Sequence, residues 1–152
     1  MNLPGAYLHI PFCAHRCTYC SFVALTGLEH EDRYHRALVR EIVDRREETD
    51  VPFDTVYFGG GTPSLLEPAE IGRLVDSCAS AFDLDSGVEI TLEANPESVT
   101  VARLEGYRAA GTTRVSFGVQ SFRDDELVRL SRLHGSARAR AALEEARAAG
   151  FD

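Results

Sequence analysis

Four short stretches rich in β-branched and aromatic residues recur along the chain, each bounded by turn residues. They span residues 6–12, 54–60, 88–94 and 113–119. Short apolar runs between Gly, Pro, Asn and Asp are typical of buried strands. In the intervening segments, apolar residues recur at intervals of three and four, which is the period of an amphipathic helix. The pattern therefore predicts four strand-helix units.

The predicted helices have clear start and stop signals. Their apolar faces cover residues 34–43, 71–82, 101–108 and 139–146. Pro68 lies near the start of the second helix, and Thr100 is a candidate N-cap for the third. Gly111 and Gly150 lie just past the third and fourth helices, where glycine commonly ends a helix.

An internal repeat supports this division. The segments "LEGYRAAG" (104–111) and "LEEARAAG" (143–150) agree at six of eight positions, and 143 minus 104 gives an offset of 39 residues. That offset is about one strand plus one helix. Because a strand follows the first copy, we expect one after the second. The chain stops at residue 152, so we expect a fold truncated before its fifth strand.

Alternating strands and helices predict an α/β fold with a parallel sheet and right-handed crossovers. Periodicity alone leaves open whether the sheet is doubly wound or curved into a barrel. The unusual residues follow the strands in order: three cysteines, then "GGGTP", "EANP" and "GVQS". They lie where both folds build their sites, at the carboxyl ends of the strands.

Composition narrows the class of protein. At 152 residues and 44% hydrophobic, the chain is long enough for one domain with a core of its own. No apolar run approaches the ~20 residues of a membrane helix, and the N-terminus lacks a basic start, so we expect a cytoplasmic protein without a transmembrane segment. A net charge of -8 argues against a partner bound through phosphate neutralisation, so we expect no nucleic acid.

Three of the four cysteines lie close together in the sequence. Cys13, Cys17 and Cys20 have the spacing C-x3-C-x2-C, whereas Cys78 falls on an apolar helix face and is expected in the core. Clustered thiolates suit zinc, a redox site or an iron–sulfur cluster. A structural zinc needs a fourth ligand, for which His9 and His15 are candidates. A [4Fe-4S] cluster held by three cysteines has one iron open to an outside ligand.

Two further motifs suit a small ligand at the same edge of the sheet. The glycines of "GGGTP" (59–63) allow close approach of the backbone, and their N–H groups suit a carboxylate. Glu93 and Gln120 lie near the ends of adjacent predicted strands, where their side chains can bind hydroxyl or ammonium groups.

The motif "Y-x-H-I-P-F-C-x3-C-x-Y-C", followed by "GGGTPS", "EANPE" and "RVSFGVQSF", resembles the radical S-adenosylmethionine superfamily. The similarity is strongest to the branch that contains oxygen-independent coproporphyrinogen III oxidases and HemW-like haem chaperones. It implies a partial TIM-type (β/α) barrel of about four units, with residues 1–152 forming the N-terminal part of the core domain and the remaining strands and C-terminal domain absent. It also implies a [4Fe-4S] cluster on the three cysteines, with S-adenosylmethionine on the open iron. The matching positions for S-adenosylmethionine are Tyr7, Tyr19, Gly60, Gly61, Thr62, Glu93, Gln120 and Arg132.

One departure bears on the branch. In the oxidases the motif continues with Gly and a further Cys after the third cysteine, whereas this chain has Ser21 and Phe22. That difference favours the haem chaperones, with haem or a porphyrin, an electron donor and a haem-accepting protein as partners. Oxidative decarboxylation of coproporphyrinogen III is the alternative, and a radical enzyme acting on RNA and a structural zinc module are lesser ones. The resemblance assigns no catalytic residue and leaves open whether the chain is an oxidoreductase.

Overall fold

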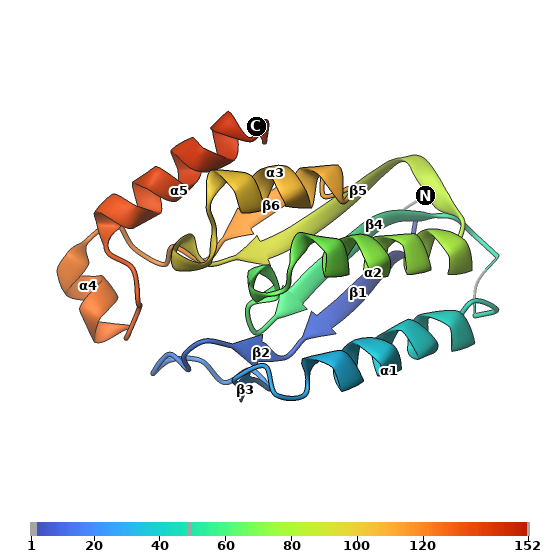
Figure 1. Cartoon of the computed structure of the whole chain (residues 1–152), viewed down its shortest axis with the longest axis horizontal. Helices are drawn as coiled ribbons and strands as arrows, with labels where there is room; N and C mark the ends of the chain where they lie inside the picture. The colour runs from blue at the N-terminus through green and yellow to red at the C-terminus, as the bar shows by residue number, and fades with distance from the viewer. Residues whose placement is uncertain (1–2, 49, 152) are drawn as a thin grey trace.

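The computed structural model describes residues 3–48 and 50–151. Its main sheet has four parallel strands in the order β1-β4-β5-β6 (Figure 1). The strands are β1 (Gly5–Ile10), β4 (Phe53–Gly60), β5 (Leu84–Ala94) and β6 (Arg114–Phe117). A doubly wound sheet reverses its strand order at a switch point, whereas here each strand pairs with the next one along the chain. The order is that of a TIM-type barrel, which decides between the two folds that periodicity left open.

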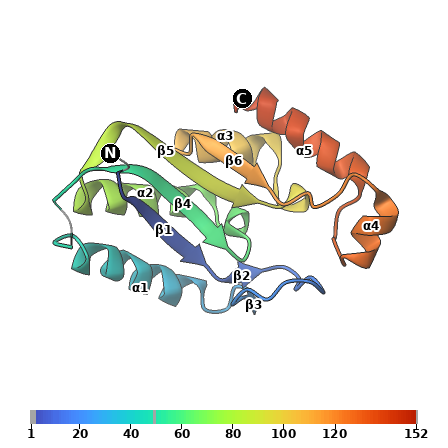
Figure 2. The same ribbon diagram turned by 180° about the vertical axis from the view of Figure 1, so that it is seen from behind.

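The helices cover one face of this sheet. They are α1 (Glu31–Asp44), α2 (Pro68–Ala81), α3 (Val101–Ala109), α4 (Asp124–Arg129) and α5 (Ser136–Ala148). α2 and α3 lie over the sheet and α1 runs beside β1, while no helix lies over the opposite face (Figures 1 and 2). In the described part of the chain, no helix is both long enough and apolar enough to cross a membrane.

The two faces of the strands have different chemistry because successive side chains alternate across a sheet. The helix-covered face supplies the main core, which includes the buried residues Leu8, Ile10, Val56, Phe58, Ile90 and Leu92. The opposite face carries polar and aromatic side chains, including Tyr7, His9, Tyr57, Glu89 and Glu93. In a barrel this second face points inward, so the sheet presents a polar interior.

The repeated segments end in the same helix cap. Gly111 and Gly150 both have positive φ, of 99° and 85°. The N–H groups of Thr112 and Phe151, one residue further on, donate at 3.0 Å to carbonyls five residues earlier. This is the Schellman arrangement, which favours glycine at its left-handed position. The expected ends of α3 and α5 are confirmed, as are the Thr100 cap and Pro68 at the start of α2.

Strand boundaries differ from the sequence expectation by more than one residue in three places. The first strand, expected over 6–12, ends at Ile10, and Phe12 belongs with Cys13 to β2 (Phe12–Cys13), which pairs with β3 (Leu25–Thr26). β5 begins at Leu84, four residues before the expected start at residue 88. β6 ends at Phe117 instead of residue 119, because Val119 and Ser121 close tight turns that break the ladder. The short helix α4 was not predicted, and two 3-10 turns, η1 (Pro63–Leu65) and η2 (Pro96–Ser98), follow β4 and β5.

A cluster of ionisable side chains joins the amino ends of α1 and α2. His35 Nδ1 lies 3.1 Å from Glu70 Oε1. Burial, and then the neighbouring Glu70 carboxylate, raise the pKa of Glu31 to about 7. Because the folded pKa lies above the ordinary value of about 4.3, the stabilising contribution is complete below that value and is lost as pH rises through about 7.

We therefore expect Glu31→Gln to remove a fall in unfolding free energy between about pH 4 and 7 and to stabilise the chain by about 1 kcal/mol at pH 8, after allowing for solvent screening. Urea unfolding of both proteins across this range measures the effect. Glu29→Gln, an exposed change two residues earlier, is the matched control. A parent whose stability is flat over this range would contradict the expectation.

Candidate functional site

A cavity of about 310 Å³ opens at the carboxyl ends of the strands. All the sequence-predicted site residues except Tyr7 line it, so residues from 13 to 132 converge on one place. A larger cavity of about 490 Å³ lies between the amino ends of β1 and β4 and the carboxyl half of α1, and no cysteine lines it. The cavity at the carboxyl ends carries the candidate chemistry, in keeping with the general position of sites in parallel α/β folds.

The loop with the three cysteines is tied at its base. The pairing of β2 with β3 closes it, and the Leu25 N–H donates to the Pro11 carbonyl at 2.6 Å. Cys13, in β2, is buried, while Cys17 and Cys20 are partly exposed. Burial raises the pKa of the Cys13 thiol, and the neighbouring thiols raise it further. A metal or cluster binds the deprotonated thiolate, so its binding would offset the free-energy cost of ionising the buried Cys13 thiol.

The thiols fit an iron–sulfur cluster better than one zinc ion. All the described cysteines are free. Ligands around one tetrahedral zinc lie about 4 Å apart, since Zn–S bonds are about 2.3 Å long. In the described part of the chain, the one set of three or more His, Cys, Asp or Glu ligand atoms within 4.8 Å of one another is Glu31, His35 and Glu70, and it includes no cysteine. The three thiols therefore do not form a set of that compactness, although all three line the same cavity.

The candidates for a fourth protein ligand differ in their position. His9, a candidate for that role, uses both ring nitrogens elsewhere: Nε2 lies 3.1 Å from the Val23 carbonyl and Nδ1 lies 3.3 Å from the Tyr7 hydroxyl. His15 lines the cavity. Cys78 is fully buried in α2, and burial raises the pKa of its thiol to about 12. The expected core position of Cys78 is confirmed.

Two glycines bring the end of β4 against the segment that leads into Cys13. Gly60 has a φ of 112°, and a Cβ there would lie 2.5 Å from His9 Nδ1. A Cβ on Gly61 would lie 2.6 Å from the Phe12 carbonyl oxygen. The absent side chains therefore make room for the chain's own atoms, whereas the sequence argument assigned that room to a ligand. Both glycines still line the cavity.

The turn after these glycines is fixed by α3. Arg103 Nη2 donates to the carbonyls of Ser64, Leu65 and Leu66 at 3.2, 3.2 and 2.7 Å. The Tyr107 hydroxyl lies 2.9 Å from two of the same carbonyls. These contacts satisfy the open carbonyls of η1 and hold the backbone that follows Thr62.

Glu93 extends from β5 toward the cavity and is held at both oxygens. Tyr57 donates its hydroxyl to Oε1 at 2.7 Å, and the Gly60 N–H donates to Oε2 at 3.2 Å. Burial and the Glu93 carboxylate raise the pKa of Tyr57 to about 12, so its hydroxyl remains a donor at neutral pH. The carboxylate keeps unused acceptor capacity for a ligand hydroxyl.

Two aromatic positions differ in their relation to the cavity. Tyr7 stacks on Tyr57 with ring centroids 6.0 Å apart on the inner face of the sheet, and it does not line this cavity. Tyr19 lines it beside Cys20 and is 47% exposed. A ligand contact for either ring stays a prediction.

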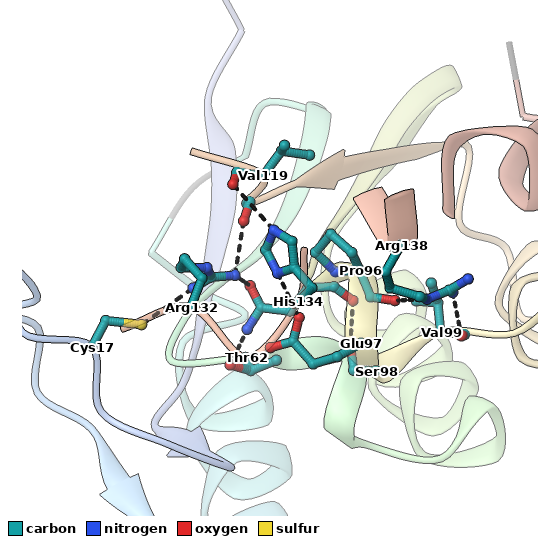
Figure 3. Close-up of polar contacts among 12 residues, drawn as sticks. Cys17, Thr62, Pro96, Glu97, Ser98, Val99, Val119, Arg132, His134 and Arg138 are labelled. Carbon is teal, nitrogen blue, oxygen red and sulfur yellow. Dashed lines mark hydrogen bonds and ion pairs between the residues drawn. The ribbon is translucent and has the colours of Figure 1, made fainter. Parts of the chain in front are cut away.

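Arg132 makes hydrogen bonds to three residues at the cavity. Its Nη1 donates to Cys17 Sγ at 3.3 Å, and its Nη2 donates to the Gly118 carbonyl at 2.8 Å and to Asn95 Oδ1 at 2.5 Å (Figure 3). Its Nε is buried without a hydrogen-bond partner in the structure. An orphaned donor of this kind fits a site that receives an anionic group such as a carboxylate.

Local structure directs Arg132 to this place. Ser131 has a φ of 56°, and the Arg132 N–H donates to the Leu127 carbonyl at 2.9 Å, which caps α4. Two residues on, His134 is buried between the Glu97 carboxylate and the Val119 carbonyl, at 2.9 and 3.2 Å (Figure 3). The loop after α4 is thereby fastened to the ends of β5 and β6.

Gln120 lines the cavity in a strained conformation. Its φ is 69°, a left-handed value that costs a non-glycine residue about 1 kcal/mol or more. Non-glycine residues with such backbone strain cluster at active sites and ligand-binding sites. No pattern in the sequence predicts this backbone conformation, because Gln is uncommon at such φ.

We expect Gln120→Gly to leave stability unchanged or raised by up to about 1 kcal/mol, because the strain is relieved, while weakening ligand binding. Thermal unfolding together with ligand titration separates the two effects. Clear destabilisation by glycine would show that the backbone is not strained.

One functional residue was missed. "EANP" was singled out as a motif at the end of a strand, and only Glu93 in it was named as a candidate site residue. Yet Asn95 lines the cavity and contacts both Arg132 and Thr62. No pattern in a single sequence distinguishes such an asparagine from an ordinary turn residue.

Known proteins resemble the chain over most of its length. The model of the "Radical SAM superfamily" matches residues 7–152. Proteins named "Heme chaperone HemW" are 44% identical in Mycobacterium tuberculosis and 38% identical in Escherichia coli, over 97% and 95% of this chain. The chain spans about two fifths of their length, 39% in both cases.

A solved structure gives the same picture. Coproporphyrinogen III oxidase from Escherichia coli, described as a radical SAM enzyme, superposes with a TM-score of 0.86 at 32% identity. The match covers 99% of this chain and 36% of that one. The four units described above thus correspond to about a third of that longer chain.

Proposed function

The chain belongs to the radical SAM superfamily, and from that premise we propose that it binds a [4Fe-4S] cluster and S-adenosylmethionine within a protein of the haem chaperone kind. The observation that carries the proposal is the set of three free thiols spread around one cavity, with the fourth cysteine shut in the core. A cluster bound by three cysteines leaves one iron for an outside ligand.

The proposal assigns different roles to different residues of the cavity. Cys13, Cys17 and Cys20 would hold the cluster. When bound, the cluster supplies electrons to the sulfonium of S-adenosylmethionine. The chain's own groups bind and orient: the Arg132 guanidinium suits a carboxylate, and Glu93 suits ribose hydroxyls.

The remaining contacts to S-adenosylmethionine rest on family resemblance and on position. Gly60, Gly61, Thr62 and Gln120 line the cavity beside the thiols and are proposed to surround the cofactor. Tyr7 and Tyr19 are proposed as aromatic contacts. These assignments give the cavity an acidic side at Glu93 and a basic side at Arg132. S-adenosylmethionine joins an amino acid to a nucleoside, so its ribose hydroxyls would face Glu93 and its carboxylate would face Arg132.

Between the two branches, the chaperone reading is preferred. Proteins named "Heme chaperone HemW" are 36–44% identical to the chain, and Ser21 and Phe22 stand where the oxidase motif continues with Gly and Cys. Haem or a related porphyrin is the proposed cargo, a haem-accepting protein the partner, and an electron donor the reductant. Oxidative decarboxylation of coproporphyrinogen III is the second candidate, favoured by the match to the oxidase structure.

The proposed location is the cytoplasm, where reducing conditions keep cluster thiols free. The acidic charge of -8 disfavours an RNA substrate. The spread of the thiols disfavours a zinc module.

The test is anaerobic reconstitution of the chain with iron and sulfide. We expect about four of each per chain and a visible absorbance that bleaches on reduction. S-adenosylmethionine should then perturb the spectrum of the reduced cluster. Stoichiometric zinc without sulfide would refute the proposal. Haem titration tests the chaperone branch, and turnover of coproporphyrinogen III tests the oxidase branch. The longer HemW and coproporphyrinogen III oxidase of Escherichia coli are the references for the two measurements.

A further inference from the structure

Asn95 directly follows β5 and is held through its main chain. Its N–H donates to Ser64 Oγ at 3.3 Å, and its carbonyl accepts from the Ser98 N–H at 3.0 Å and from Ser98 Oγ at 2.8 Å. The following Pro96 favours the extended conformation that Asn95 adopts, with φ -100° and ψ 144°. The direction of the side chain is therefore set by the fold.

The neighbours of the side chain fix which way its amide faces. A guanidinium can only donate, so the atom 2.5 Å from Arg132 Nη2 must be the acceptor Oδ1. The amide nitrogen Nδ2 then faces Thr62 Oγ1 at 3.1 Å. This orientation is assigned from the hydrogen-bond pattern, which is how amide groups are oriented in proteins.

The amide in turn fixes the direction of the Thr62 hydroxyl. Because Thr62 Oγ1 accepts from Asn95, its own proton is free to point to Cys13 Sγ, 3.6 Å away. On the other side, Arg132 Nη1 points to Cys17 Sγ at 3.3 Å. Asn95 thus donates to Thr62 on one side and accepts from Arg132 on the other, and these two partners donate to two of the three cysteines. Figure 3 shows the contacts of Thr62 and Arg132 and the bond to Cys17.

We propose that Asn95 is a positioning residue, which orients the Thr62 hydroxyl and the Arg132 guanidinium toward the cysteine sulfurs. The proposal rests on the proposed function, because it assigns a use to these donors on a bound cluster. Hydrogen bonds to the cysteine sulfurs help set the reduction potential of an iron–sulfur cluster. Asn95 would act through the other two residues and not touch the cluster itself.

The sharpest test is Asn95→Asp, which keeps the size and the acceptor that faces Arg132 but removes the donor that faces Thr62. The Thr62 hydroxyl then turns to the new carboxylate and leaves Cys13. We expect iron and sulfide content to stay at the parent level, while the reduction potential of the cluster becomes more negative. In Asn95→Ala, which frees Arg132, we expect the affinity for S-adenosylmethionine to fall about tenfold.

Two further variants separate positioning from general damage. Ser98→Ala removes a bond to the Asn95 main chain and leaves the amide in place, so it should lower the unfolding midpoint without moving the potential. Thr62→Val removes the donor to Cys13 directly. If Asn95 acts through Thr62, the potential shift of the Asn95→Asp/Thr62→Val double variant should be smaller than the sum of the single shifts.

The outcomes separate a failure of the proposed function from a failure of the role assigned to Asn95. A parent chain that takes up no iron and sulfide overturns the proposed function, and this inference with it. A parent that loads normally, beside Asn95 variants with unchanged potential and unchanged affinity, overturns the inference alone. Additive shifts in the double variant overturn the route through Thr62.

Discussion

Replacing Cys13, Cys17 or Cys20 by Ala is expected to abolish [4Fe-4S] binding, with iron and sulfide falling from about four per chain to near zero. Each thiolate would hold a different iron, and no other described cysteine can reach the cavity because Cys78 is buried in α2. Iron and sulfide analysis after anaerobic reconstitution measures the loss.

Cys78→Ala is the matched control. It removes a buried sulfur from the core, so stability should fall by about 1 kcal/mol or more while iron uptake is preserved. Full iron content in any of the three loop variants would mean that the cluster has another ligand, and loss of iron in Cys78→Ala would contradict its placement.

The second large effect is expected at Glu93. In Glu93→Gln the amide nitrogen must face either the Tyr57 hydroxyl or the Gly60 N–H, and both groups donate in the parent. The Tyr57 hydroxyl can turn and accept from the amide nitrogen, so the main loss is the negative charge and one oxygen acceptor for the ligand. We expect the affinity for S-adenosylmethionine to fall about 10- to 100-fold with the cluster intact, as measured by equilibrium dialysis of the reconstituted chain.

Glu89→Gln provides the comparison. It changes the same residue type on the same strand and face, four residues nearer the amino end, and Glu89 lies outside the cavity. Its affinity should match that of the parent. A Glu93 variant that binds S-adenosylmethionine normally would remove Glu93 from the proposed contacts.

The overall architecture could be predicted from the sequence, because hydrophobic periodicity and the turn and capping residues at the ends of elements depend on local chemistry. The four main strands and four of the five helices appear in the expected order, and the glycine caps of α3 and α5 are confirmed. Helix α4 has only six residues, which is too short for a periodic apolar face. The strand order that identifies a barrel depends on long-range pairing, which periodicity does not encode.

The candidate site was predicted in part. Residues in quoted motifs, such as Cys13 and Glu93, lie where expected, at the carboxyl ends of the strands. The residues that link the motifs were not predicted: Asn95 lay in a quoted motif without a role of its own, and His134 lay outside every quoted motif. Their roles arise from partners more than 30 residues away in sequence, beyond the reach of any local pattern.

The bond from Arg132 to Cys17 also has a consequence for biosynthesis. The two residues are 115 positions apart, so Cys17 leaves the ribosome well before its partner. At about 5–20 residues per second, the cysteine loop waits on the order of ten seconds before the guanidinium exists. Asn95 is made 37 residues before Arg132, so the thiols lack both residues at first and lack Arg132 throughout the interval. Loading of the proposed cluster in its final surroundings would therefore be a late event, which follows translation of α4 and does not accompany emergence of the cysteine loop.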